Sequence, residues 1–185
     1  MNFNEHWNIE GRHAFLSPSQ YHWINYDLDK LETRFYNSKA AERGTELHEY
    51  AATAIRLGRK QPKTKDTINM FVNDALGYSM TPEQPLYYSD NCFGTADAIS
   101  FHKGKILRIH DLKTGITPAS MMQLEIYAAI FCLEYGKDPH DLEIILRIYQ
   151  SNEKEELLPD PDEIRSIMDT IVEFDMHIEK FKEAM

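Results

Sequence analysis

Two acidic residues and a lysine near the middle of the chain have the types and spacing of a cation-binding site. Asp111 and Lys113 are two residues apart at the end of a predicted strand, so their side chains point to the same face. Asp97 lies on the preceding predicted strand and comes opposite Asp111 if the two strands form an antiparallel hairpin. Two carboxylates placed in this way can bind one hard divalent cation. The alternative is an ordinary ion pair between Asp111 and Lys113.

The residues around Asp97 favour the cation. Ala96, Ala98 and Ile99 make this strand otherwise apolar. A carboxylate without a partner in such surroundings is costly, and either a cation or an ion pair offsets that cost.

Three further polar side chains are candidates for the same site. Gln123 and Tyr127 are four residues apart on a predicted helix and therefore lie on one face of it. His48 lies on an earlier predicted helix. Each has an ordinary alternative, because a tyrosine is often buried with its hydroxyl satisfied, and a single histidine is often a core or surface residue.

The charge of the chain is unevenly distributed. The 185 residues have a formal net charge of −10, which argues against tight non-specific binding to nucleic acid. Residues 153–185 contain eleven acids and four bases and therefore hold most of this charge. Residues 56–65 have five bases and no acid, and are either a phosphate-binding surface or a solvated linker.

The two cysteines, Cys92 and Cys132, are too few for a disulfide framework, a four-cysteine zinc site or a four-cysteine iron–sulfur cluster. No apolar run reaches the roughly 18 residues of a membrane helix, and the N-terminus lacks the apolar core of a signal peptide. We therefore expect a cytoplasmic protein that does not bind membranes.

The elements that must position these residues follow from periodicity and from turn residues. Helices are expected over residues 17–36, 39–57, 64–78, 118–135 and from about 160 nearly to the end, with Ser38 capping the second. Strands are expected over residues 85–89, 93–101, 105–113 and 142–149, and a polar connection over 152–158. This order predicts an α/β fold with a central mixed sheet flanked by helices.

Together these segments resemble the RecB-like branch of the PD-(D/E)xK nuclease superfamily, including phage exonucleases of the lambda type and CRISPR-associated RecB-like nucleases. The matching pieces occur in the family's order over residues 16–127. They are Leu16-Ser17-Pro18-Ser19, Arg43-Gly44-Thr45-x-x-His48, Gly94-x-x-Asp97, Asp111-x-Lys113 and Gln123-x-x-x-Tyr127. The resemblance implies one domain over residues 1–185 with a restriction-endonuclease-like αβββαβ core. Residues 1–80 would be its helical N-terminal part, 81–150 the catalytic core, and 151–185 an acidic linker and C-terminal helix.

The resemblance also implies roles for individual residues. His48, Asp97, Asp111 and the Leu112 carbonyl would bind Mg²⁺ or Mn²⁺. Lys113 would activate the attacking water and offset the charge of the phosphate. Gln123 and Tyr127 would position the strand or the lysine, and Arg43 would hold a DNA phosphate.

We therefore expect a metal-dependent deoxyribonuclease, an exonuclease rather than an endonuclease, from phage or mobile-element recombination or repair. Its expected partners are DNA and a phage recombination or single-strand-binding protein, and an oligomer is compatible with the resemblance. Two alternatives stay open. One is a nuclease-fold protein that binds DNA or protein without cutting, and the other is a metal phosphohydrolase that acts on a smaller substrate.

Overall fold

The structure is a computed structural model and describes residues 14–184. The chain divides into two compact units, residues 1–45 and residues 46–185. The first unit contains the 3₁₀ helix η2 (Pro18–Asn25) and the start of helix α1 (Leu28–Arg56), which continues into the second unit.

Helix α1 corrects the prediction of two helices that meet at Ser38. It is continuous from Leu28 to Arg56, and it begins where the Asp27 carboxylate accepts a hydrogen bond from the Lys30 amide at 2.7 Å. Ser38 therefore lies inside the helix and caps nothing. A single serine costs only a few tenths of a kcal/mol relative to alanine inside a helix, which is too little to end one.

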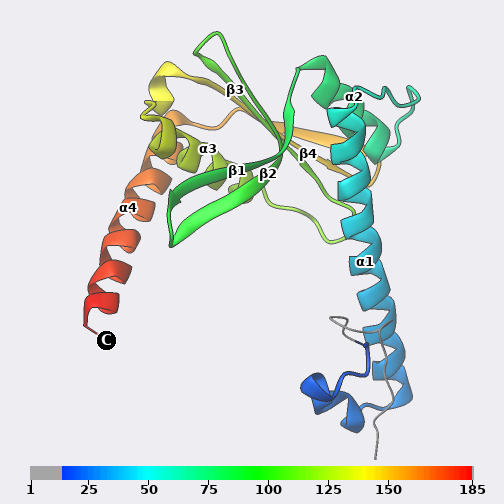
Figure 1. Cartoon of the computed structure of the whole chain (residues 1–185). Coiled ribbons are helices and arrows are strands. Elements are labelled where there is room, and N and C mark those ends of the chain that lie inside the picture. Colours follow the sequence, from blue (N-terminus) through cyan, green and yellow to red (C-terminus); the bar gives the residue numbers. More distant parts are fainter. Residues whose placement is uncertain (1–13, 185) are drawn as a thin grey trace, which may run out of the picture. The chain divides into compact units, whose positions relative to one another are not determined.

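The second unit contains the sheet and the remaining helices (Figure 1). Its elements after α1 are α2 (Thr67–Gly77), β1 (Thr81–Ser89), β2 (Cys92–His102), β3 (Ile106–Leu112), α3 (Met122–Tyr135), η3 (Pro139–Asp141), β4 (Glu143–Gln150), β5 (Glu153–Leu157) and α4 (Pro161–Glu183). The predicted α/β fold with a mixed sheet is confirmed.

The five strands pair in their sequence order. All neighbouring strands are antiparallel except β3 and β4, which are parallel and are joined through α3. A parallel pair needs such a crossover, whereas the antiparallel pairs are joined by short turns. The crossover brings the start of α3 back to the end of β3, where Asp111 and Lys113 lie.

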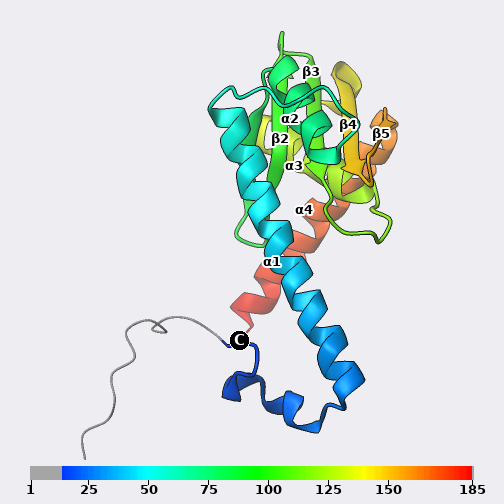
Figure 2. The ribbon, with the colours of Figure 1, turned by 90° about the vertical axis from the view of Figure 1, so that its right-hand side faces the viewer.

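Each face of the sheet has its own core. On one face, Ile109 and Leu146 of the sheet pack with Leu124 and Ala128 of α3 and with Ile164 of α4. On the other, Leu112 and Tyr149 pack with Ala51 of α1 and with Phe71 and Val72 of α2. Figure 2 looks onto this second face, with α2 and the end of α1 in front of the strands.

Three boundaries differ from the predicted ones. Strand β1 begins at Thr81 rather than at Pro85, and α3 begins at Met122 rather than at Pro118. The predicted polar connection over 152–158 contains β5, which pairs with β4. Most of this strand is exposed and charged, as is common in edge strands, so it lacks the apolar alternation by which strands are predicted.

A buried polar network lies between α2 and the sheet. The Tyr149 hydroxyl donates to Asp74 at 2.7 Å and contacts His110 Nδ1 at 3.3 Å, and Arg147 pairs with Asp74 at 3.2 Å. His110 is fully buried, and its Nε2 has no hydrogen-bond partner. Burial lowers the pKa of His110 to about 3, assisted by the positive charge of Arg147. The folded protein therefore keeps this histidine neutral over most of the pH range.

We expect His110 to make the fold sensitive to mild acid. The unfolded chain takes up a proton at the ordinary pKa of 6.5, whereas the folded protein does not until about pH 3. Stability should therefore fall as the pH drops through this window, by up to about 1.4 kcal/mol per pH unit from this group. Urea unfolding between pH 7 and 4 should show a shallower decline for His110→Phe than for the parent. Equal slopes would contradict the assignment.

His140, whose pKa is raised rather than lowered, is the control for His110→Phe. His140 is exposed and lies 3.1 Å from Asp138 and 2.9 Å from Asp162, and its hydrogen bonds to these carboxylates raise its pKa. Its stabilising contribution is present at low pH and is lost as the pH rises through the raised pKa. His140→Gln should therefore make the decline in acid steeper.

Candidate active site

The candidate site lies where strands β2 and β3 separate. Their pairing ends at Ala98 and His110, one residue before Asp97 and Asp111 would face each other. Beyond this point, Asp97 Oδ2 accepts a hydrogen bond from the Leu112 amide at 2.8 Å. The carboxylate thus takes the place of a backbone acceptor, and the two acidic residues are held beside the opening.

His48 approaches this opening from α1. Its Nε2 lies 2.6 Å from the Leu112 carbonyl oxygen and 3.3 Å from Asp97 Oδ2. The imidazole is about one-third exposed and Asp97 is less so, which leaves the cluster open to solvent on one side. His48 is therefore in contact with two of the other three predicted ligand groups.

Asp111 is the most deeply buried acidic group of the cluster, with 5% of its side chain exposed. Its Oδ1 accepts a hydrogen bond from the Lys113 ammonium at 3.2 Å. Its Oδ2 is 3.0 Å from the same ammonium but accepts no hydrogen bond of good geometry and is sealed from solvent. Burial and then the negative charge of Asp97 raise the pKa of Asp111, and Lys113 opposes them.

Lys113 is held between two acceptors. Besides its contact with Asp111, the ammonium donates to Gln123 Oε1 at 2.8 Å. Asp111 and Lys113 share one face because they are two apart at the end of β3, and Gln123 reaches them from the first turn of α3. The lysine side chain is 30% exposed.

Tyr127 hydrogen-bonds to β2 rather than to Lys113. Its hydroxyl donates to the Thr95 carbonyl at 2.8 Å, and its ring lies over Gly94. A Cβ added to Gly94 would lie 2.9 Å from Tyr127 Cε1, closer than such contacts occur. The Gly94-x-x-Asp97 spacing thus provides a flat stretch of strand for the tyrosine, three residues before the carboxylate.

Arg43 lies in the first unit, on the part of α1 that precedes Thr45, and its side chain is exposed. It is the one predicted site residue that belongs to the first unit rather than to the second.

Glu83 on β1 is a residue that sequence reasoning missed. The β1–β2 register places it across from Asp97, where the pairing is interrupted, and its backbone has a positive φ of 51°. Burial raises the pKa of Glu83, followed by the negative charge of Asp97, while His48 and Arg56 oppose the rise. Glu83 was missed because the strand was predicted to begin at Pro85, two residues after it.

The donor set suits a hard divalent cation. Adjacent ligand atoms around an octahedral ion lie about 3 Å apart when each is about 2.0–2.1 Å from the metal. His48 Nε2 lies 2.6 Å from the Leu112 carbonyl oxygen and 3.3 Å from Asp97 Oδ2. The sealed Asp111 oxygen without a hydrogen bond is a further donor. Among residues 14–184, no three His, Cys, Asp or Glu side chains already stand in ligating geometry. Ligation by His48 Nε2 also requires its proton to be on Nδ1.

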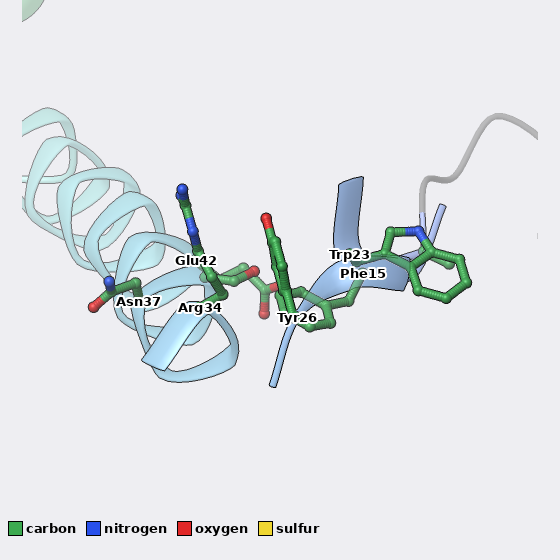
Figure 3. A pocket seen from close by; sticks show the side chains of 8 residues that line it. Phe15, Trp23, Tyr26, Arg34, Asn37 and Glu42 are labelled. Carbon is green, nitrogen blue, oxygen red and sulfur yellow. The ribbon is translucent and has the colours of Figure 1, made fainter. Parts of the chain in front are cut away.

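A separate hollow of about 390 Å³ lies in the first unit (Figure 3). The Tyr26 ring stands there beside the Arg34 and Glu42 side chains of α1, and Trp23 points away from them. None of the candidate ligand residues His48, Asp97, Asp111 and Leu112 lines this hollow.

Comparison with protein-family models, curated proteins and solved structures finds no significant match to this chain. In the described residues, no helix combines the length and apolar character needed to span a membrane.

Replacing Asp111 should stabilise the protein in the absence of cations. Because burial raises the pKa of this carboxyl, Asp111→Asn should raise the melting temperature in EDTA at pH 7 by about 2–4 °C, equivalent to about 1 kcal/mol. The difference should shrink as the pH falls toward 4, because the parent carboxyl then takes up a proton. Added Mn²⁺ should stabilise the parent but not the variant. Circular-dichroism melts test all three expectations.

Asp169→Asn is the matched control, since Asp169 is exposed on α4. It should respond to Mn²⁺ as the parent does. Equal stabilisation of the parent and Asp111→Asn by Mn²⁺ would remove Asp111 from the cation site. A lower melting temperature of Asp111→Asn in EDTA would mean that the ion pair with Lys113 outweighs the cost of burial.

Proposed function

We propose that this chain is a metal-dependent DNA nuclease of the RecB-like PD-(D/E)xK type. One observation carries the proposal. The His48 imidazole contacts Asp97 and the Leu112 carbonyl at the opening between β2 and β3, and Asp97 and His48 are near enough to Asp111 to affect the pKa of its carboxyl, beside a lysine held by Asp111 and Gln123. A fold-stabilising ion pair would need only Asp111 and Lys113, and would not require a second carboxylate and an imidazole beside it.

His48, Asp97, Asp111 and the Leu112 carbonyl would hold Mg²⁺ or Mn²⁺. When bound, such an ion lowers the pKa of a coordinated water and stabilises charge on the phosphate. The imidazole favours Mn²⁺ somewhat, because it is a softer ligand than a carboxylate.

The protein residues supply orientation and a fixed positive charge. The Lys113 ammonium stands ready to donate a hydrogen bond to the attacking water or to a phosphate oxygen. Gln123 fixes the lysine, and Tyr127 fixes the strand that carries Asp97. Preorganised donors of this kind stabilise the transition state without having to rearrange during the reaction.

DNA is the proposed substrate, and an exonuclease of phage or mobile-element recombination is the proposed type. Residues 56–65 contain five bases and begin at Arg56, the last residue of α1, the helix that carries His48. A basic segment attached to this helix attracts phosphates beyond the one that is cleaved, which supports a polymeric substrate. Arg56 is eight residues after His48, or about 12 Å along the helix axis. Arg43 is proposed as a phosphate ligand, and a recombination or single-strand-binding protein as a further partner.

The competing function is a nuclease-fold protein that binds without cutting, which the acidity of the chain favours. One assay separates the two. Linear and circular, single- and double-stranded DNA are incubated with Mg²⁺, Mn²⁺ or EDTA. An exonuclease degrades only the linear forms and only with metal. A protein that binds DNA but cuts none of these substrates under any metal would overturn the proposal.

Lys113→Ala should leave Mn²⁺ binding nearly unchanged but slow cleavage by about 10²–10³-fold, the usual loss for one preorganised donor. DNA binding should weaken only slightly, because at most one phosphate contact is lost. Single-turnover cleavage, Mn²⁺-induced melting shifts and filter binding measure the three quantities. Lys180→Ala, an exposed lysine on α4, is the control. Cleavage by Lys113→Ala at the parental rate would remove the lysine from the reaction.

A further inference from the structure

An exposed pair of aromatic rings lies on the hairpin that carries Asp97. Phe93 on β2 is the cross-strand partner of Tyr87 on β1, and the two rings stack with centroids 6.3 Å apart and an interplanar angle of 24°. Phe93 is 67% exposed and Tyr87 is 49% exposed, although aromatic side chains are mostly buried in folded proteins. The Tyr87 hydroxyl donates to Asp90 at 2.8 Å, which fixes its ring. Phe93 and Tyr87, the aromatic pair, thus hold two nearly parallel rings at the surface.

The aromatic pair lies on the same face of the sheet as Asp97. Side chains alternate between the two faces of a strand, so Phe93 and Asp97, four residues apart on β2, point to one face. The contacts of this strand agree, because Gly94 lies against Tyr127 of α3 on the opposite face, whereas Asp97 contacts His48 of α1. Four residues of strand measure about 13 Å, so this is the separation of the aromatic pair from Asp97 along β2.

The surface between the aromatic pair and Asp97 is uncharged. The cross-strand pair that lies there is Thr95 with Pro85, and both residues are exposed. A ligand that extends from the candidate cation site to the aromatic pair therefore passes a hydroxyl and a proline ring and no carboxylate, in a chain with a net charge of −10. Such a surface suits a ligand that combines an anionic backbone with flat apolar groups.

We propose that the aromatic pair is a base-stacking platform for single-stranded DNA that is cleaved at the candidate cation site. The proposal rests on the proposed nuclease function and adds a preference for unpaired strands to it. Bases of any sequence stack on aromatic rings, but the faces of bases inside a duplex are already covered. A DNA strand rises about 3.4 Å per nucleotide in the B form, so about 13 Å of strand β2 corresponds to at most about four nucleotides. The stacked base is therefore within about four nucleotides of the cleaved phosphate.

The first test measures binding in EDTA, which prevents metal-dependent cleavage, by fluorescence anisotropy of one sequence as a single strand and as a blunt duplex. Phe93→Ala should weaken single-strand binding about tenfold and duplex binding less than about twofold. Phe93→Trp should bind as well as the parent, whereas Phe93→Leu should be as weak as Phe93→Ala, because leucine is apolar but has no ring to stack on. Phe174→Ala removes a phenylalanine of similar exposure, 62%, from α4 and should bind as the parent does.

Equal losses on the single strand and the duplex would overturn the platform, as would full single-strand binding by Phe93→Leu. A parent that binds neither form of DNA would overturn it too, and would leave the aromatic pair as a contact for another protein.

A second test changes the DNA instead of the protein. One abasic site is moved through the four nucleotides on each side of the cleaved bond, and single-turnover cleavage is measured with Mn²⁺. At one position the missing base should slow the parent about tenfold, and at that position it should have no further effect on Phe93→Ala, because the two changes remove the same contact.

The two tests separate the platform from the nuclease function. If Phe93 is needed for single-strand binding but the parent cuts no DNA, the nuclease function fails while the platform stands. If the parent cuts DNA and neither the abasic sites nor Phe93→Ala alters the rate, the platform is wrong while the nuclease function stands.

Discussion

The hydrogen bond from the Leu112 amide to the Asp97 carboxylate is the contact on which the site depends. It lies where β2 and β3 stop pairing, and it satisfies a backbone amide that would otherwise lose its partner. By accepting that bond, Asp97 is held at the end of β3, where it lies beside His48, which also contacts the Leu112 carbonyl. A continuous β2–β3 ladder would have used these backbone groups in the sheet and left no room for a cation.

The same opening places Asp111 in surroundings that are unfavourable for a charged carboxylate. The Oδ2 atom of this carboxylate is sealed from solvent and lacks a hydrogen bond, and the carboxylate faces the negative charge of Asp97 as well as the positive charge of Lys113. A structure optimised for stability alone would place an asparagine or an apolar residue there. A buried carboxylate that destabilises the fold and lies beside an ordered lysine is characteristic of a site that binds a ligand.

The parts of the structure that could be predicted from sequence are those that depend on local pattern. The spacing of Asp111 and Lys113, the alternation of β2 and β3, and the i, i+4 pair on α3 are all local, and the mixed sheet follows from the order of elements. Glu83 and Gln150 could not be found in this way. Glu83 depends on where β1 begins, and the Gln150 side-chain amide donates to the Gly115 carbonyl, 35 residues earlier in the chain. Such contacts between distant segments leave no periodic signal.

Because Tyr127 lies so close to Gly94, a substitution at one of these positions affects the other. A side chain at position 94 displaces the ring, and a smaller residue at 127 makes room for it but removes the donor to the Thr95 carbonyl. A side chain at position 94 therefore requires the Tyr127 ring to move, and a compensating pair still lacks the hydrogen bond to the strand that holds Asp97. A glycine without a functional group and a tyrosine outside the proposed cation site thus limit which sequences can keep Asp97 in this position.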